Sequence, residues 1–229
     1  VMLLLARLAA VVFHMDVVEE ASSGYPNSGN MAIPLVNAIF GPEWVVFVTL
    51  YNMIQNLFVW THCRMFMSGE RKISLKKILW NINIMAILLG AALFFLDIRL
   101  PKILSDTLTS VSSMLGPTAM LIVGMLMADL KLEDLKGYRR IWKPILFRLV
   151  VLPLVLVFLT RLLHVSAMNP QGETLVLVAL IPAFAPAANV VAQFSQIYDL
   201  DAKYAGLINA VTMLLCIVTM PLLVAVYQM

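Results

Sequence analysis

Two stretches of the chain place proline beside asparagine inside otherwise apolar sequence, and their side chains are the best candidates for chemistry. Tyr25–Leu35 reads YPNSGNMAIPL, and Ile181–Val190 reads IPAFAPAANV. Because proline lacks a backbone N–H and clashes with the preceding helical turn, each stretch predicts a broken helix. The amides of Asn27 and Asn189 each supply two N–H donors without a fixed charge. Freed backbone N–H groups and positive helix ends favour negative charge, so the pattern predicts a site for an anion.

Two further amides follow the first broken stretch, on the next apolar run. Gln55 is expected to project toward the same site, and Asn52 lies about one turn away on a similar face. The alternative for both side chains is a buried hydrogen bond between two helices. The candidate substrate-binding residues are therefore Asn27, Ser28, Asn30, Pro34, Asn52, Gln55, Pro186 and Asn189.

The composition indicates that the elements holding these residues cross a membrane. Of the 229 residues, 62% are hydrophobic and 13% are charged, whereas a soluble domain is about 45–50% apolar and about 25% charged. This excludes a soluble globule, a disordered chain and a disulfide scaffold, and makes the lipid bilayer the expected partner. The net charge of +3 is too small to suggest nucleic-acid binding. Cys63 and Cys216 match no metal or disulfide spacing, so we expect both to be buried core residues.

Several apolar runs have the length of a spanning helix, about 20 residues. The candidate spans are Trp44–Cys63, Ile78–Leu96, Thr107–Ala128, Pro144–His164, Thr174–Tyr198 and Tyr204–Met229. Two weaker pieces, Val1–Phe13 and Ser22–Phe40, precede them, and the first resembles the tail of a helix. Arg148 and Arg161 lie near the two ends of one span, where their side chains are expected to snorkel. Barrel strands would instead alternate over about ten residues, so the predicted fold is an all-α polytopic membrane protein.

Two loops, Arg64–Lys77 and Lys131–Lys143, hold ten of the sixteen lysine and arginine residues. Two spans separate these loops, so they face the same side of the membrane. Since basic loops remain in the cytoplasm, we expect both loops there and Met229 on the outside.

The residues around the broken stretches resemble the auxin efflux carrier family. Pro26–Gly41 is similar to a P-N-T…M-G-I-P-L…A-x-Y-G string of plant members. Gln55 and the pair Trp60–Thr61 resemble the helix that follows in that family. In the C-terminal half, Pro186–Asn189 and Thr219–Leu222 resemble bacterial members, including the malate and malonate permease group.

The resemblance implies ten helices in two inverted five-helix repeats, with helices four and nine broken and crossing near the membrane midplane. On that plan the chain holds about seven to eight helices, from the end of helix three onward, and is truncated at its N-terminus. Residues 1–67 and 142–229 would form a transport domain. Residues 78–129 would form part of a scaffold, which is often the contact of a homodimer.

The function implied by the resemblance is secondary transport of a small organic anion, such as a carboxylate, by alternating access at the crossing. The expected location is the cell membrane, which for a bacterial member of the family is the inner membrane.

Two departures from the family concern helix starts. Asn81–Asn83 stands where many members have Asn-Pro, so helix six is expected to start without its usual proline. Val191 replaces a proline of plant members, which leaves the position of the second break open.

Other classes of function find less support in the sequence. It has no metal-ligand histidine pair, no G-x-S-x-G motif and no phosphate-cradling loop, so we expect no enzyme, metal or cofactor. A non-transport membrane sensor or scaffold with the same fold is the alternative function. Coupled transport usually needs a buried carboxylate. Asp16, Glu19 and Glu20 precede the first broken helix and could titrate, but a solvated loop is the preferred interpretation.

Overall fold

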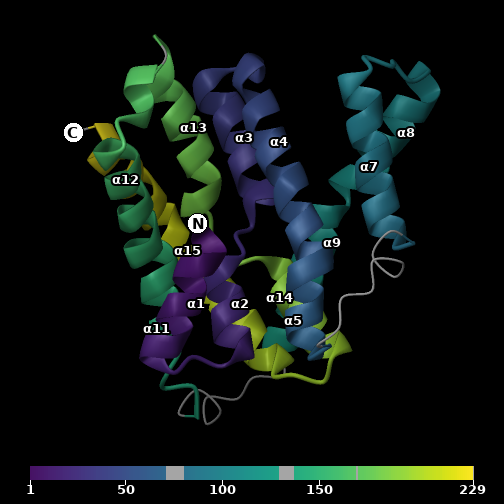
Figure 1. The fold of residues 1–229 in the computed structure, drawn as a ribbon. Helices are drawn as coiled ribbons and strands as arrows, with labels where there is room; N and C mark the ends of the chain where they lie inside the picture. The colour runs from purple at the N-terminus through teal and green to yellow at the C-terminus, as the bar shows by residue number, and fades with distance from the viewer. Residues whose placement is uncertain (71–79, 129–136, 169, 229) are drawn as a thin grey trace.

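The computed structural model describes residues 1–70, 80–128, 137–168 and 170–228, which confirm the all-α prediction (Figure 1). Their α-helices are α1 (Met2–Phe13), α2 (Val17–Gly24), α3 (Ser28–Phe40), α4 (Pro42–Phe58), α5 (Arg64–Ser68), α7 (Ile82–Phe95), α8 (Lys102–Ser113), α9 (Leu115–Ala128), α11 (Trp142–Leu146), α12 (Leu152–Leu162), α13 (Gly172–Phe184), α14 (Asn189–Ile197) and α15 (Ala202–Gln228). In these ranges, extended pairing is limited to an isolated antiparallel bridge between Pro26 and Ala187.

Within the described ranges, two helices are long and apolar enough to cross a membrane by length and composition, Trp142–Leu162 and α15. The first consists of α11, the π-helical turn Phe147–Val151 and α12. A second π-helical turn, Val59–Cys63, joins α4 to α5. Cys63 and Cys216 are buried free thiols, as predicted.

The predicted span Thr107–Ala128 has one irregular residue, Met114, whose backbone keeps right-handed helical angles (φ −76°, ψ −18°). Helix α8 ends at Ser113 and α9 begins at Leu115, with Met114 between them. Pro117 offers no N–H to the carbonyl of Ser113, and its ring clashes with that carbonyl. In α9 the regular pattern restarts with the hydrogen bond from the Thr118 N–H to the Met114 carbonyl, at 3.0 Å.

Two interrupted helices cross in the middle of the molecule, as the two proline-rich stretches predicted. In Figure 1, α3 and α13 lie in the upper half, and α2 and α14 lie in the lower half. Their interruptions meet as short extended segments. The Asn27 N–H donates to the Pro186 carbonyl at 2.8 Å, and the Ala188 N–H donates to the Tyr25 carbonyl at 2.9 Å. The second break therefore lies before Val191, because Val191 already belongs to the first turn of α14.

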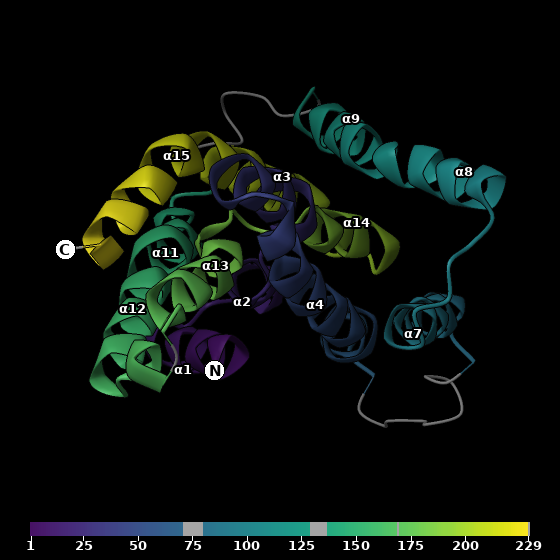
Figure 2. The same cartoon turned by 90° about the horizontal axis from the view of Figure 1, so that it is seen from above.

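Helices α7, α8 and α9 lie to one side of this crossing. Seen from above, α7 and α8 stand apart from the other helices, and α9 leads back toward α15 (Figure 2). Helix α7 contacts α4, while α9 contacts α14 and α15. Asn81 caps α7, because its side-chain oxygen accepts from the Asn83 and Ile84 N–H groups. This helix therefore starts without a proline, as expected.

The solvated-loop interpretation is wrong for Glu19. This residue belongs to α2 and is only 1% exposed. Its carboxylate accepts the Tyr204 hydroxyl at 2.8 Å and the Asp16 N–H at 3.0 Å. Asp16 in turn accepts from the Glu19 N–H, which completes a capping box at the start of α2. Glu20 forms an ion pair with Arg7 at 2.8 Å, so the acidic segment is part of the helical bundle.

Residues of the two basic loops stabilise helix ends where the structure describes them. Arg140 and Lys143 donate to the carbonyls of His14 and Phe13 at the C-terminus of α1, where positive charge is favourable. Arg64 donates to the hydroxyl of Tyr198 at 3.2 Å. The remaining loop residues within 71–79 and 129–136, and Met229, lie outside the described residues. The predicted orientation of the chain in the membrane stays a prediction.

Candidate functional site

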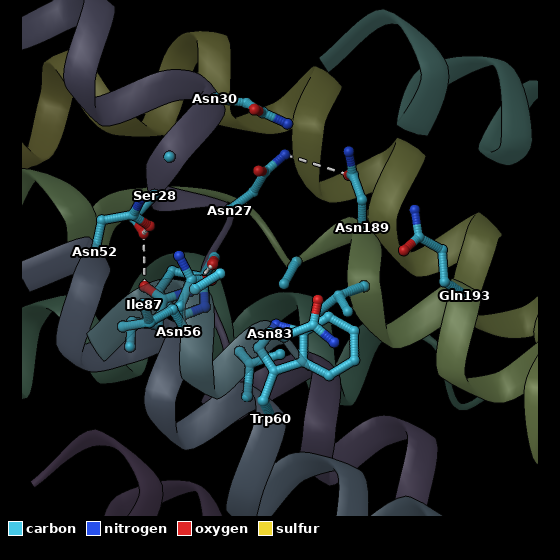
Figure 3. A pocket seen from close by; sticks show the side chains of 17 residues that line it. Asn27, Ser28, Asn30, Asn52, Asn56, Trp60, Asn83, Ile87, Asn189 and Gln193 are labelled. Carbon is cyan, nitrogen blue, oxygen red and sulfur yellow. Dashed lines mark hydrogen bonds between the residues drawn. The ribbon is translucent and has the colours of Figure 1, made fainter. Parts of the chain in front are cut away.

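A cavity of about 450 Å³ lies between the crossing and α7. This volume falls in the range of about 300–1,000 Å³ that is typical of small-molecule sites. The lining residues come from the crossing, α4 and its π-helical extension, α7 and α14, and several are shown in Figure 3. They are Pro26, Asn27, Ser28, Gly29, Asn30, Asn52, Gln55, Asn56, Val59, Trp60, Asn83, Ala86, Ile87, Ala188, Asn189, Val190 and Gln193.

Six of the eight candidate residues line this cavity: Asn27, Ser28, Asn30, Asn52, Gln55 and Asn189. The two prolines do not. Pro34 lies in the interior of α3 and is exposed, on another side of that helix. Pro186 is buried in the second interruption, where its carbonyl accepts the Asn27 N–H. Both prolines therefore shape the backbone and do not reach the cavity.

The two crossing asparagines contact each other. The Asn27 Nδ2 donates to the Asn189 Oδ1 at 3.2 Å, as Figure 3 shows. Asn209 of α15 donates to the same oxygen at 2.8 Å. Asn189 is 5% exposed, and its Nδ2 has no hydrogen-bond partner within the described part of the chain. A buried donor without a partner is costly, so a ligand that accepts from it would be stabilised.

The N-termini of α3 and α14 both face the cavity. Ser28, Gly29 and Asn30 form the first turn of α3, and Asn189 and Val190 begin α14. Neither helix has a side-chain cap. The first N–H groups of a helix have no partner within the helix, and the positive end of its dipole lies there. Two such ends side by side favour an anion.

The C-termini of the other two half-helices, α2 and α13, meet at Arg148, whose side chain is expected from the sequence to snorkel. This prediction is wrong, since Arg148 is 0% exposed. Its guanidinium donates to the Ala185 carbonyl at 2.8 and 3.0 Å, to the Ala183 carbonyl at 3.0 Å and to the Ser23 carbonyl at 3.4 Å. The positive group therefore satisfies carbonyls at the negative ends of two helices.

Arg148 also gives the crossing a formal positive charge that sequence reasoning had not found. In the described residues, the guanidinium forms no ion pair. The charge is held by carbonyl oxygens alone, in the interior of an apolar bundle. Such a charge adds positive potential around the crossing, because interactions are screened less there than in water.

Gln55 secures the first interruption. Its Nε2 donates to the Pro26 carbonyl at 2.5 Å. The Ser28 hydroxyl lies 2.6 Å from the Gln55 Oε1 and 3.0 Å from the Asn52 Oδ1. These contacts match the alternative considered for the two amides, a buried hydrogen bond between helices. Gln55 thus supports the backbone of the site.

Replacing Gln55 with leucine is expected to lower the free energy of unfolding by about 1–3 kcal/mol, because the Pro26 carbonyl loses its donor. Denaturant unfolding in detergent measures this change. Asn56→Leu is the matched control, since Asn56 lines the same cavity and its side chain has no hydrogen bond in the described residues. Equal stabilities of the two variants would contradict the assigned role of Gln55.

Several cavity residues were missing from the sequence prediction. Asn56 follows Gln55 directly and stands four residues after Asn52, so helical spacing could have indicated it. Asn83 and Gln193 carried no such signal, because they reach the cavity from α7 and from further along α14. Trp60 packs edge-on against Phe194, with ring centroids 5.4 Å apart, and closes the lower side of the site in Figure 3.

Comparison with known proteins finds a related family. The sequence profile of a family described as membrane transport protein matches residues 14–224. No curated protein matches the chain. The matched region contains both interrupted helices and all residues that line the cavity. The family is one of transporters and not of enzymes.

Proposed function

The chain belongs to the membrane transport protein family, which includes the auxin efflux carriers, and on this premise we propose that it carries a small organic anion. The proposed substrate has a carboxylate group, which binds at the crossing of the two interrupted helices. The protein acts as a secondary transporter in the cell membrane and catalyses no chemical reaction.

One observation carries this proposal: two uncapped helix N-termini meet beside the Asn189 Nδ2, a buried donor without a partner. A carboxylate can accept from this amide and from the free N–H groups of the first turns. None of the residues that line the cavity is charged. The site therefore offers donors without a fixed lysine or arginine, which favours reversible binding over permanent capture.

The position of the cavity suggests how the substrate crosses the membrane. The crossing forms one wall and α7 forms the other. We assign residues 1–67 and 142–229 to a transport domain and residues 78–129 to a scaffold. This division follows the pattern of two inverted repeats. Movement of one body against the other would open the cavity to alternate sides, as in many secondary transporters. A homodimer formed through the scaffold would fix that body in the membrane.

Flux of labelled carboxylates through the complete protein in liposomes tests the proposal. Malonate and indole-3-acetate serve as a small dicarboxylate and an aromatic acid. Losing one hydrogen bond to a charged group costs about 1.5–3 kcal/mol. Asn27→Ala and Asn189→Ala are therefore expected to weaken the apparent affinity for a transported acid by roughly 10- to 150-fold.

The control variant is Cys63→Ala, a buried substitution outside the cavity, which should transport like the wild type. Wild-type kinetics in both asparagine variants would show that the crossing is only structural. A complete protein that moves neither acid would contradict the proposed substrate class and favour the sensor or scaffold alternative.

A further inference from the structure

We propose that Asn209 of α15 is a positioning residue that sets the selectivity of the crossing for anions. Asn209 does not line the cavity. It holds the Asn189 amide in the orientation that leaves its Nδ2, a buried donor, without a partner among the described residues. This inference rests on the proposed function, because it concerns how the same site distinguishes an anionic ligand from a neutral one.

The orientation of Asn209 is fixed by the backbone. Its Nδ2 donates to the Ala187 carbonyl at 2.6 Å. Because a carbonyl can only accept, the nitrogen and not the oxygen of Asn209 must face it. The side chain is 1% exposed, and its Oδ1 has no partner among the described residues. The donor side of Asn209 therefore determines how this amide is placed.

The orientation of Asn189 follows from that of Asn209. The Asn209 Nδ2 also donates to the Asn189 Oδ1, at 2.8 Å, and the Asn27 Nδ2 donates to the same oxygen at 3.2 Å. Rotating the Asn189 amide by half a turn would place its NH₂ group against two other NH₂ groups. Amide orientation is inferred from such networks, and here the network permits one. The Asn189 Nδ2 is thereby left as the unpaired donor.

A second residue of α15 supports the backbone of the second interruption without contacting the side-chain amides of Asn189 and Asn209. The Thr212 hydroxyl accepts the Ala187 N–H at 3.2 Å and donates to the Asn209 carbonyl at 2.9 Å. Thr212 and Asn209 together satisfy both backbone groups of Ala187. Only Asn209 also determines which atom of Asn189 is free. This difference separates a structural role from a role in selectivity.

Asn209→Asp tests the inference, because a carboxylate at this position accepts and does not donate. The Asn189 amide would then turn its NH₂ toward residue 209 and present its oxygen to the ligand. Binding to the complete purified protein is measured for two pairs of probes, malonate with malonamide and indole-3-acetate with indole-3-acetamide. The ratio of acid affinity to amide affinity is expected to fall by at least about tenfold, because the acid loses one hydrogen bond and the new carboxylate repels it.

Asn209→Leu is the second variant, since a buried aspartate can prevent folding. It removes the donor without adding charge, and the ratio should fall in the same direction. Thr212→Val should weaken the binding of acid and amide equally and leave their ratio unchanged. A wild-type protein that binds neither acid would contradict the proposed function. A wild-type preference for the acid that persists in every folded Asn209 variant would overturn the role of Asn209 alone.

Discussion

Replacing Arg148 with methionine is expected to lower the free energy of unfolding by about 3 kcal/mol or more, beyond the 0.5–3 kcal/mol of a typical substitution. The side chain is fully buried and donates to the carbonyls of Ser23, Ala183 and Ala185. Each buried carbonyl that loses its donor costs about 1–3 kcal/mol. Removing a buried charge offsets part of this cost. The carbonyls stay at the centre of the crossing, however, where methionine cannot pair with them.

Denaturant unfolding and the yield of monodisperse protein in detergent measure the effect. Arg148→Lys should be intermediate, because an ammonium group keeps the charge but lacks the planar fork of donors that reaches several carbonyls. Arg161→Met is the matched control. Arg161 also donates to helix-terminal carbonyls, those of Val226 and Tyr227, but it is exposed. Stability of Arg148→Met equal to that of Arg161→Met would show that the crossing needs no buried cation.

The broken helices could be predicted from the sequence because their cause is local. A proline removes the N–H of its own position and disturbs the turn before it. Pro26 and Pro186 therefore mark the two interruptions to within a few residues. Asparagine beside each break likewise indicated where donors gather, and Asn27 and Asn189 do meet.

The buried charges could not be predicted in this way, because their partners are far away in the sequence. Arg148 is 37 residues from Ala185 and 125 residues from Ser23. Glu19 and the Tyr204 hydroxyl that it accepts are 185 residues apart. A position near the end of an apolar run is compatible with either exposure or burial. Only the folded chain shows that these two side chains lie inside.

Asn209 illustrates a different limit of sequence reasoning. Helix α15 continues unbroken through Gly206, one turn before this residue, so no helix break marks Asn209 as part of a site. Its contacts with Ala187 and Asn189 arise from the packing of α15 against the second interruption. The irregularity at Met114, within Thr107–Ala128, has a local cause instead. Pro117 is the sequence signal for it.

Replacing Asn189 with aspartate is expected to abolish anion transport while largely preserving the shape of the site. Two like charges about 4 Å apart repel by about 4 kcal/mol at an effective dielectric constant of about 20, which corresponds to roughly a thousandfold loss of affinity. Flux of labelled malonate and indole-3-acetate measures the effect, with size-exclusion chromatography to verify folding.

Gln193→Glu is the control, because Gln193 lines the cavity one turn further along α14 and is more exposed than Asn189. Its added charge is better screened by solvent and should weaken transport much less. Unchanged carboxylate transport by Asn189→Asp would place the anion elsewhere. Because the same substitution would strengthen a site for a cation, a gain in cation flux would show that the crossing accepts the opposite charge.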